Sequence, residues 1–231
     1  MTGTAGEEVG RIAALGLPVL FPDTCFLLDD PTRPTVRPEY REAAVALVDA
    51  MASRAVVGFI APQVVTELNG NRSKAESEAA EALRKLAEEL RRMDEVLSVY
   101  GGAGRSDIGH LFDHGPCAKK LLDRWLPSFS SAPEPVDIGT RAFARIALTR
   151  TPARKGSASA QDCVVTETYL DLATKLRGHG LTASIVFASS NTRDYCETTG
   201  SNLKADLARE FAACRMEFAP NFGAARFLLG V

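Results

Sequence analysis

The stretch that decides the fold runs from residue 183 to residue 194 and reads ASIVFASSNTRD. Its first half is apolar and β-branched, which is typical of a buried strand in a parallel sheet. Its second half turns through polar residues and presents an acid, Asp194. Ligand sites of parallel sheets form beyond the carboxyl ends of the strands, so we expect Asp194 at the edge of a site.

Two further apolar runs are also followed by acids. Residues 17–21 (LPVLF) end at Pro22 and are followed by Asp23. Residues 55–60 (AVVGFI) precede Pro62, which suits the first turn of a helix that carries Glu67. A fourth acid, Asp162, opens a helical stretch at residues 159–177. Strands that alternate with helices predict an α/β fold with a mostly parallel sheet.

The rest of the chain reads mainly as helix. Apolar residues recur at helical spacing over residues 39–51, and the longest such pattern covers residues 72–99. Further helices are expected at residues 116–126, 138–149 and 202–214, and a short strand at 216–218 followed by a tail. We therefore predict a single domain over residues 1–231 with a helical insertion at about 72–150.

Composition places the chain among ordinary globular proteins. Of its 231 residues, 45% are hydrophobic and 24% charged, and no apolar run approaches the length of about 20 residues that crosses a bilayer. The first fifteen residues do not resemble a secretory signal, and none of the five cysteines forms a Cys-x-x-Cys pair. We expect a cytoplasmic protein with reduced thiols and no membrane partner. The net charge of −2 provides no global basic field for nucleic acid, although local basic residues can still follow a phosphate backbone.

The four acids form a candidate metal site. Each has apolar neighbours in the sequence, and burying charge without a partner costs several kcal/mol. Clustered carboxylates raise one another's pKa, so such a cluster must hold protons or bind a cation. Oxygen ligands suit a hard ion, Mg²⁺ or Mn²⁺.

The segments around these acids resemble the four acidic motifs of PIN-domain ribonucleases, in the same order and at similar separations. The matching segments are Asp23-Thr24-Cys25, PQVVTEL at residues 62–68, Lys155-Gly156 through Gln161-Asp162, and SSNTRDY at residues 189–195. The resemblance covers about residues 17–218 and implies a three-layer α/β/α sandwich that hydrolyses RNA with a divalent metal.

The resemblance also implies roles for individual residues. Asp23 and Asp162 are expected to bind metal directly, Asp194 directly or through water, and Glu67 to bind metal or position the attacking water. Supporting roles are expected for Glu167, Ser190 and Asn191, and phosphate contacts for Arg193 and Lys155. In one departure, Cys25 stands where the family often has Asn, and a thiol is a poor hydrogen-bond partner for Asp23.

Other readings remain open at this point. An Asp after the first strand also begins haloacid-dehalogenase-like phosphotransferases, but their second Asp is replaced by Cys25. His110 and His114 have metal-ligand spacing but lack the glutamate of the zinc-protease motif. A PIN-like fold can also serve as a non-catalytic RNA- or protein-binding module. A nuclease of this kind is either the toxin of a toxin–antitoxin pair, with an antitoxin partner, or an RNA-processing or defence enzyme, and the family suggests a homodimer.

Overall fold

The computed structural model describes residues 5–32, 34, 36–153, 160–198 and 200–231. Within these residues the protein has a five-stranded sheet in which every neighbouring pair of strands is parallel, in the order β3-β2-β1-β4-β5. The strands are β1 (Val19–Pro22), β2 (Val57–Ile60), β3 (Phe129–Ser131), β4 (Ile185–Ala188) and β5 (Met216–Ala219). The α/β class and the parallel sheet predicted from the sequence are confirmed.

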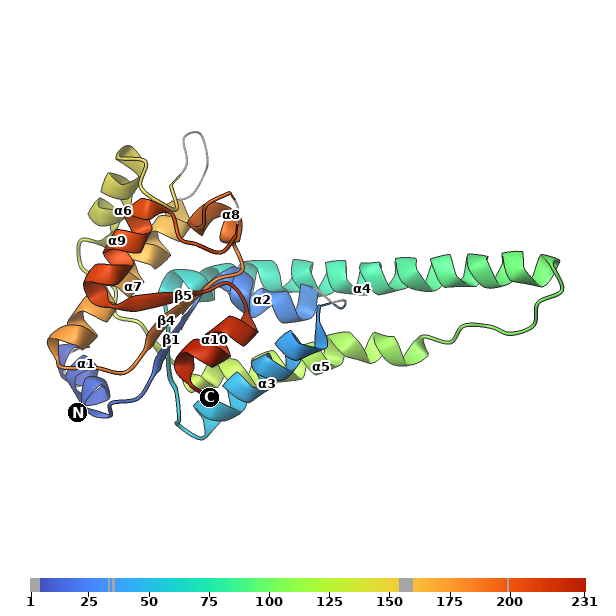
Figure 1. Ribbon diagram of the computed structural model, residues 1–231, viewed down its shortest axis with the longest axis horizontal. Helices are drawn as coiled ribbons and strands as arrows, with labels where there is room; N and C mark the ends of the chain where they lie inside the picture. The colour runs from blue at the N-terminus through green and yellow to red at the C-terminus, as the bar shows by residue number, and fades with distance from the viewer. Residues whose placement is uncertain (1–4, 33, 35, 154–159, 199) are drawn as a thin grey trace.

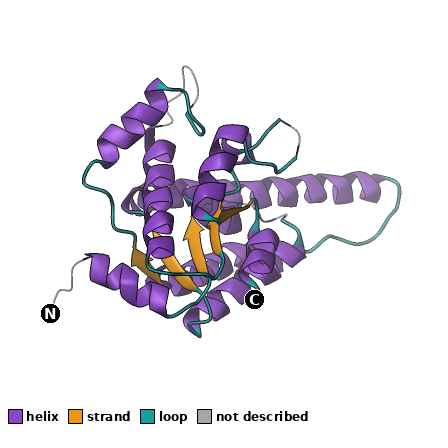
Figure 2. Cartoon of the chain, turned by 60° about the vertical axis from the view of Figure 1, so that its left-hand side comes forward, coloured by secondary structure: helices purple, strands orange, loops and turns teal. Residues whose placement is uncertain are grey.

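Helices surround the sheet (Figures 1 and 2). They are α1 (Ala5–Ala14), α2 (Thr24–Thr32), α3 (Pro38–Ala52), α4 (Pro62–Val99), α5 (His114–Trp125), α6 (Ile138–Ala147), α7 (Ala160–Gly178), α8 (Thr192–Tyr195), α9 (Ala205–Cys214) and α10 (Phe222–Leu229). The connections from β1 to β3 run toward one edge of the sheet and those from β3 to β5 run toward the other. Right-handed crossovers then place the two groups of helices on opposite faces, consistent with a three-layer α/β/α sandwich.

The strand order reverses between β1 and β4, which lie side by side at the centre of the sheet. Their register pairs Val19 with Ile185 and Pro22 with Ala188, and all four residues of each strand are buried. In open parallel sheets, the point of reversal leaves a crevice beyond the carboxyl ends of the two central strands. Asp23 and Ser189 directly follow these two strands.

A buried tyrosine fixes the carboxyl ends of β1 and β2. The Tyr169 hydroxyl, on α7, donates to the Pro22 carbonyl at 2.7 Å and accepts from the Ala61 N–H at 3.0 Å. Its ring stacks on Phe21 with centroids 4.7 Å apart. Tyr169 thereby links the residue before Asp23 to the residue before α4.

We expect Tyr169→Phe to lower the free energy of unfolding by about 2 kcal/mol, because it leaves a buried N–H and a buried carbonyl without their partner. In a protein of this size, this corresponds to a fall of about 5 °C in the melting temperature, measured by circular dichroism. The matched control is Tyr100→Phe, because the Tyr100 side chain is 83% exposed. Equal melting temperatures for the two variants would contradict the proposed role of the hydroxyl.

Helix α4 forms a long arm. Its 38 residues span about 57 Å at 1.5 Å per residue, and its outer part leaves the body of the protein with α5 running beside it (Figure 1). The two helices expected on either side of residue 70 are one helix, since the backbone stays helical through Gly70. Exposed apolar residues, among them Met93, Leu97 and Tyr100, mark its outer end.

The predicted helical insertion at residues 72–150 needs correction. Strand β3 lies inside this range and pairs with β2 through Gly58 and Phe129, so part of the segment belongs to the sheet. The predicted C-terminal tail contains α10, which begins at an Asn221 cap and ends at Gly230, where φ is +73°. None of the described helices combines the length and apolar character that a bilayer-spanning segment requires.

Candidate functional site

Asp23 lies at the junction of β1, β4 and α2. Its backbone N–H donates to the Ala188 carbonyl of β4 at 2.8 Å, and its own carbonyl accepts from Leu27 in the first turn of α2. Its carboxylate accepts from the Thr24 N–H at 2.7 Å, the Ser189 hydroxyl at 2.7 Å and the Cys25 thiol at 3.1 Å. The Asp23 side chain is therefore held in one orientation by the first two residues of α2 and by the residue that follows β4.

The environment of Asp23 opposes its negative charge. Burial raises the pKa of Asp23 above its usual 3.8, against the lowering effect of its hydrogen bonds from Ser189, Cys25 and Thr24, and the charge of Glu67 adds to the rise. Burial, together with the charge of Asp23, also raises the pKa of Cys25. The thiol therefore stays protonated and donates to Asp23, so Cys25 does support Asp23, through the weaker donor expected of a thiol.

Glu67 reaches Asp23 from the second turn of α4. One carboxylate oxygen accepts from the Thr24 hydroxyl at 2.7 Å, and the other accepts from Gln63 Nε2, one helical turn earlier, at 3.0 Å. Since the Thr24 backbone donates to Asp23 and its side chain donates to Glu67, this single residue links the two acids.

Asp162 approaches from the first turn of α7. It lines a cavity of about 360 Å³ together with Glu67, Thr66 and Gln161. Burial raises the pKa of the Tyr195 hydroxyl well above 10, and the charges of Asp23 and Asp162 raise it further. Tyr195, which is fully buried, is thus a neutral phenol that is subject to the charges of both acids.

Asp194 lies on α8, just beyond β4. Its carboxylate accepts from Asn191 Nδ2 at 2.7 Å, and its carbonyl accepts from Lys204 Nζ at 2.7 Å. The turn itself is tied back to the acids, because the Ser189 hydroxyl accepts from the Asn191 N–H at 3.2 Å and donates to Asp23. Asn191 therefore orients the acid directly, and Ser189 connects the turn to β1.

The structure connects the four predicted acids at the carboxyl end of the sheet only in part. Asp23 and Glu67 share the Thr24 bridge, Glu67 and Asp162 share a cavity, and Asp194 lies on the adjacent turn. Among the described residues, no three His, Cys, Asp or Glu side chains are grouped closely enough to hold one metal ion. A buried carboxylate beside a second carboxylate still favours a hard cation, so the oxygen donors fit Mg²⁺ or Mn²⁺ in chemistry.

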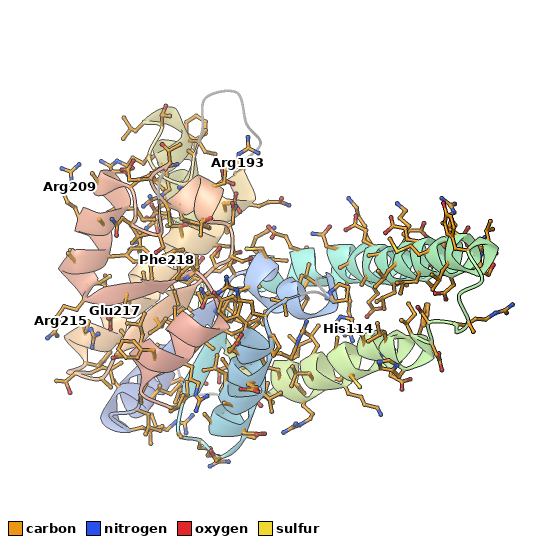
Figure 3. All side chains as sticks on the ribbon, turned by 45° about the vertical axis from the view of Figure 1, so that its right-hand side comes forward. His114, Arg193, Arg209, Arg215, Glu217 and Phe218 are labelled. Atoms are coloured by element: carbon orange, nitrogen blue, oxygen red, sulfur yellow. The ribbon has the colours of Figure 1, made fainter. Side chains whose placement is uncertain are left out.

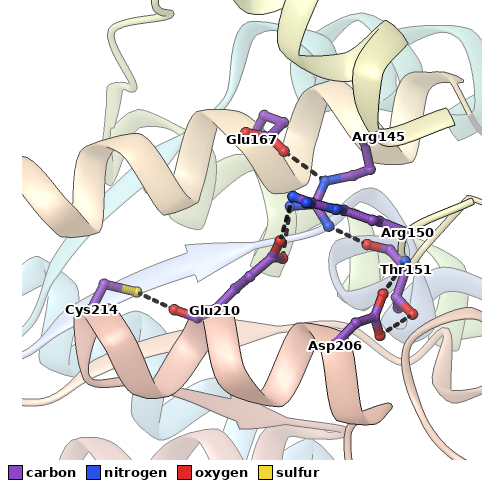
Figure 4. A network of polar contacts seen from close by, with 7 residues as sticks. All are labelled: Arg145, Arg150, Thr151, Glu167, Asp206, Glu210 and Cys214. Carbon is purple, nitrogen blue, oxygen red and sulfur yellow. Dashed lines mark hydrogen bonds and ion pairs between the residues drawn. The ribbon is translucent and has the colours of Figure 1, made fainter. Parts of the chain in front are cut away.

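The remaining predicted residues are less closely connected to these acids. Glu167 accepts from Arg145 Nε at 2.7 Å, within a network that joins α6, α7 and α9 (Figure 4). Arg193 is exposed on α8 and projects outward (Figure 3). Ser190 interacts with the Cys25 thiol, and Lys155 lies outside the described residues.

Four residues of the site were not predicted from the sequence: Thr24, Gln63, Ser189 and Tyr195. All four lie within the motif segments, so proximity to the acids is a signal that could have identified them. Two of these roles depend on partners far away along the chain: Thr24 bonds a residue 43 positions away and Ser189 one 166 positions away, whereas Gln63 bonds Glu67 within the same helix.

No protein-family model matches the chain, and searches of curated proteins and of solved structures found no similar protein.

Proposed function

We propose that this protein is a divalent-metal-dependent endoribonuclease of the PIN-like kind. The observation that carries the proposal is the bonded cluster at the reversal point of the sheet, where Ser189 of the β4 end donates to Asp23 of the β1 end and Thr24 links Asp23 to Glu67. A carboxylate this buried, beside a second one, is costly unless a cation or a proton balances it. The donors around Asp23 hold it in place for that cation.

Each acid has a distinct part in this proposal. Asp23, which follows the end of β1, and Asp162, at the start of α7, would bind the cation directly. Asp194 would bind it directly or through a water molecule. Glu67, oriented by Thr24 and Gln63, would bind the cation or position the attacking water. When bound, Mg²⁺ or Mn²⁺ would lower the pKa of a water and neutralise charge on the scissile phosphate.

A non-catalytic RNA- or protein-binding module is the second candidate. It is favoured by the engagement of Asp23 and Glu67 with five hydrogen-bond donors in total, because a cation would have to displace or reorient some of them. The antitoxin partner, the homodimer and the choice between toxin, RNA-processing and defence roles remain predictions of the family resemblance.

Cleavage of a labelled single-stranded RNA tests the proposal. We expect cleavage with Mn²⁺ or Mg²⁺ and none with EDTA. Asp162→Asn should slow it by on the order of 100-fold, because the substitution removes a preorganised charge from the site. The matched control is Asp137→Asn, which makes the same change in an acid paired with Arg141 outside this site.

The outcomes separate the two candidates. Cleavage that resists EDTA, or that Asp162→Asn leaves at the wild-type rate, would rule out this site as its source. RNA that binds the protein but is never cut, with either metal, would favour the binding module.

A further inference from the structure

A second cavity opens at the same end of the sheet, next to the acids. It has a volume of about 400 Å³, and its walls come from α3, from the turn after β4, from the loop before α9 and from the start of α10. Residues of these walls include Tyr40, Arg41, Ser190, Ser201, Asn221 and Phe222. Ser190 directly follows Ser189, which donates to Asp23, so the cavity begins one residue away from the acidic cluster.

Two aromatic residues give the cavity an apolar, ring-lined part. Phe222 is 4% exposed and packs on Phe26 with centroids 4.2 Å apart, so it forms a rigid wall. Tyr40 is only half-buried, and its ring lies against Gly223, where an added Cβ would come within 3.6 Å of it. A partly exposed ring held in place is a stacking surface for any nucleobase.

Polar groups line the same cavity. The Oδ1 atom of Asn221 accepts from the Ala224 N–H at 2.9 Å and so caps α10. The Nδ2 amide of Asn221 can then donate a hydrogen bond to a ligand in the cavity. The hydroxyls of Ser190 and Ser201 can each donate or accept a hydrogen bond. Such a mixture suits the polar edge of a base, and the volume lies within the usual range of ligand cavities, about 300–1,000 Å³.

The charges of the two neighbouring cavities differ. The cavity with Glu67 and Asp162 is acidic, whereas the described walls of the second cavity contain Arg41 and no carboxylate. Arg41 also borders a groove over α3 and α5 that includes Lys120. A phosphate backbone that leaves the second cavity by this route meets basic side chains, which favour polyanion binding.

We propose that this second cavity, called the base cavity below, binds one unpaired nucleobase of an RNA strand beside the phosphate that reaches the acids. The inference rests on the proposed ribonuclease function, because RNA is its substrate there. The base cavity would hold the RNA strand through contacts with a base, whereas the acids and their cation would act on the phosphate.

The test fills the base cavity and measures binding and cleavage separately. Ser201 is exposed, so Ser201→Trp can place a ring in the cavity without disturbing the core, and Ser77→Trp on the exposed face of α4 is the matched control. Binding of a fluorescein-labelled single-stranded RNA is measured by anisotropy in EDTA, and kcat and KM are measured with Mn²⁺. We expect Ser201→Trp to weaken binding and raise KM about tenfold, as loss of one stacked base would, while Ser77→Trp matches the wild type.

Oligonucleotides with a single abasic position make the test specific for a base. When the missing base is the one that the cavity holds, the wild type should bind about tenfold more weakly, and Ser201→Trp should lose little more. Equal losses in both proteins at every position would overturn the inference, as would a Ser201→Trp variant with wild-type affinity and KM.

The base cavity and the nuclease proposal can fail independently. RNA that binds the wild type, loses affinity with Ser201→Trp and is never cut supports the base cavity and overturns the nuclease. RNA that is cut with an unchanged KM in Ser201→Trp overturns the base cavity alone. Absence of both binding and cleavage in the wild type overturns both.

Discussion

Asp23→Asn is expected to slow RNA cleavage severely while leaving the protein as stable as the wild type, or more stable. Asparagine keeps the shape of the side chain and can still accept the Thr24 N–H, and the Ser189 hydroxyl and Cys25 thiol that donate to the other oxygen can rotate to accept from its amide. The substitution removes the charge that would hold a cation. We expect kcat to fall by on the order of 10³-fold, as for the loss of a preorganised electrostatic contact in an active site. The measurement is single-turnover cleavage of labelled RNA with Mn²⁺.

The stability part of this prediction follows from the direction of the pKa shift. Burial raises the pKa of Asp23 in the folded protein, so the folded state binds a proton more tightly than the unfolded state does. Protonated Asp23 therefore stabilises the folded protein at pH values below the pKa that Asp23 has in the unfolded chain. This stabilisation is lost as the pH rises through the pKa of Asp23 in the folded protein, so at neutral pH the charged carboxylate lowers the free energy of unfolding. Asparagine relieves that cost, and the melting temperature at pH 7 should not fall.

The control is Asp49→Asn, because Asp49 is an exposed acid of α3 that pairs with Arg124 on the surface. It should cleave RNA at the wild-type rate. A large fall in the melting temperature of Asp23→Asn, with activity lost in proportion to the unfolded fraction, would show that Asp23 is a structural residue.

The central sheet was predictable because its signals are local. The four residues of β4 are all buried, so a short apolar run was enough to identify the strand, and the same holds for β1. Parallel strands end at a common edge, which brought Asp23 and Asp194 together in the prediction without any knowledge of the strand order. The position of these two acids beyond the ends of β1 and β4 thus follows from a pattern visible in the sequence.

Strand β3 was not predictable in the same way. It has three residues, two of them serines, and it becomes a strand by pairing with β2, about 70 positions earlier. Helix α10 was missed although its signals were present, since Asn221 is a favourable first cap and Gly230 a favourable end. The distinction is physical: caps are local, whereas strand pairing is a contact over a long loop.

The spacing of Glu167 explains why it lies apart from the acids. Five residues along a helix rotate a side chain by about 140° relative to the first, so Asp162 and Glu167 point to different neighbours. Glu167 meets Arg145 of α6 instead, in the network shown in Figure 4. The spacing of Asp162 and Glu167 is visible in the sequence, but the contact between Glu167 and Arg145, 22 positions earlier, is not.

Arg145→Met is expected to destabilise the protein by about 3 kcal/mol, because it removes the positive partner of two carboxylates. The Arg145 side chain is 1% exposed; its Nε donates to Glu167 and its Nη2 to Glu210, each at 2.7 Å. Its Nη1 donates to the Thr151 carbonyl, so it also joins the loop after α6 to this network. Burial alone would lower the pKa of Arg145, but the hydrogen bond and charge of Glu210 and the charge of Glu167 raise it.

Two comparisons isolate the buried charge in this prediction. Arg141→Met, on the same helix, removes an arginine from the more exposed pairs with Asp137 and Asp171 and should cost less than about 1 kcal/mol. The triple variant Arg145→Met, Glu167→Met, Glu210→Met should recover most of the lost stability, because no carboxylate is then left without its partner. Urea unfolding at pH 7 gives all three values. If Arg145→Met were no less stable than Arg141→Met, the buried network would contribute no more to stability than the more exposed pairs of Arg141 do.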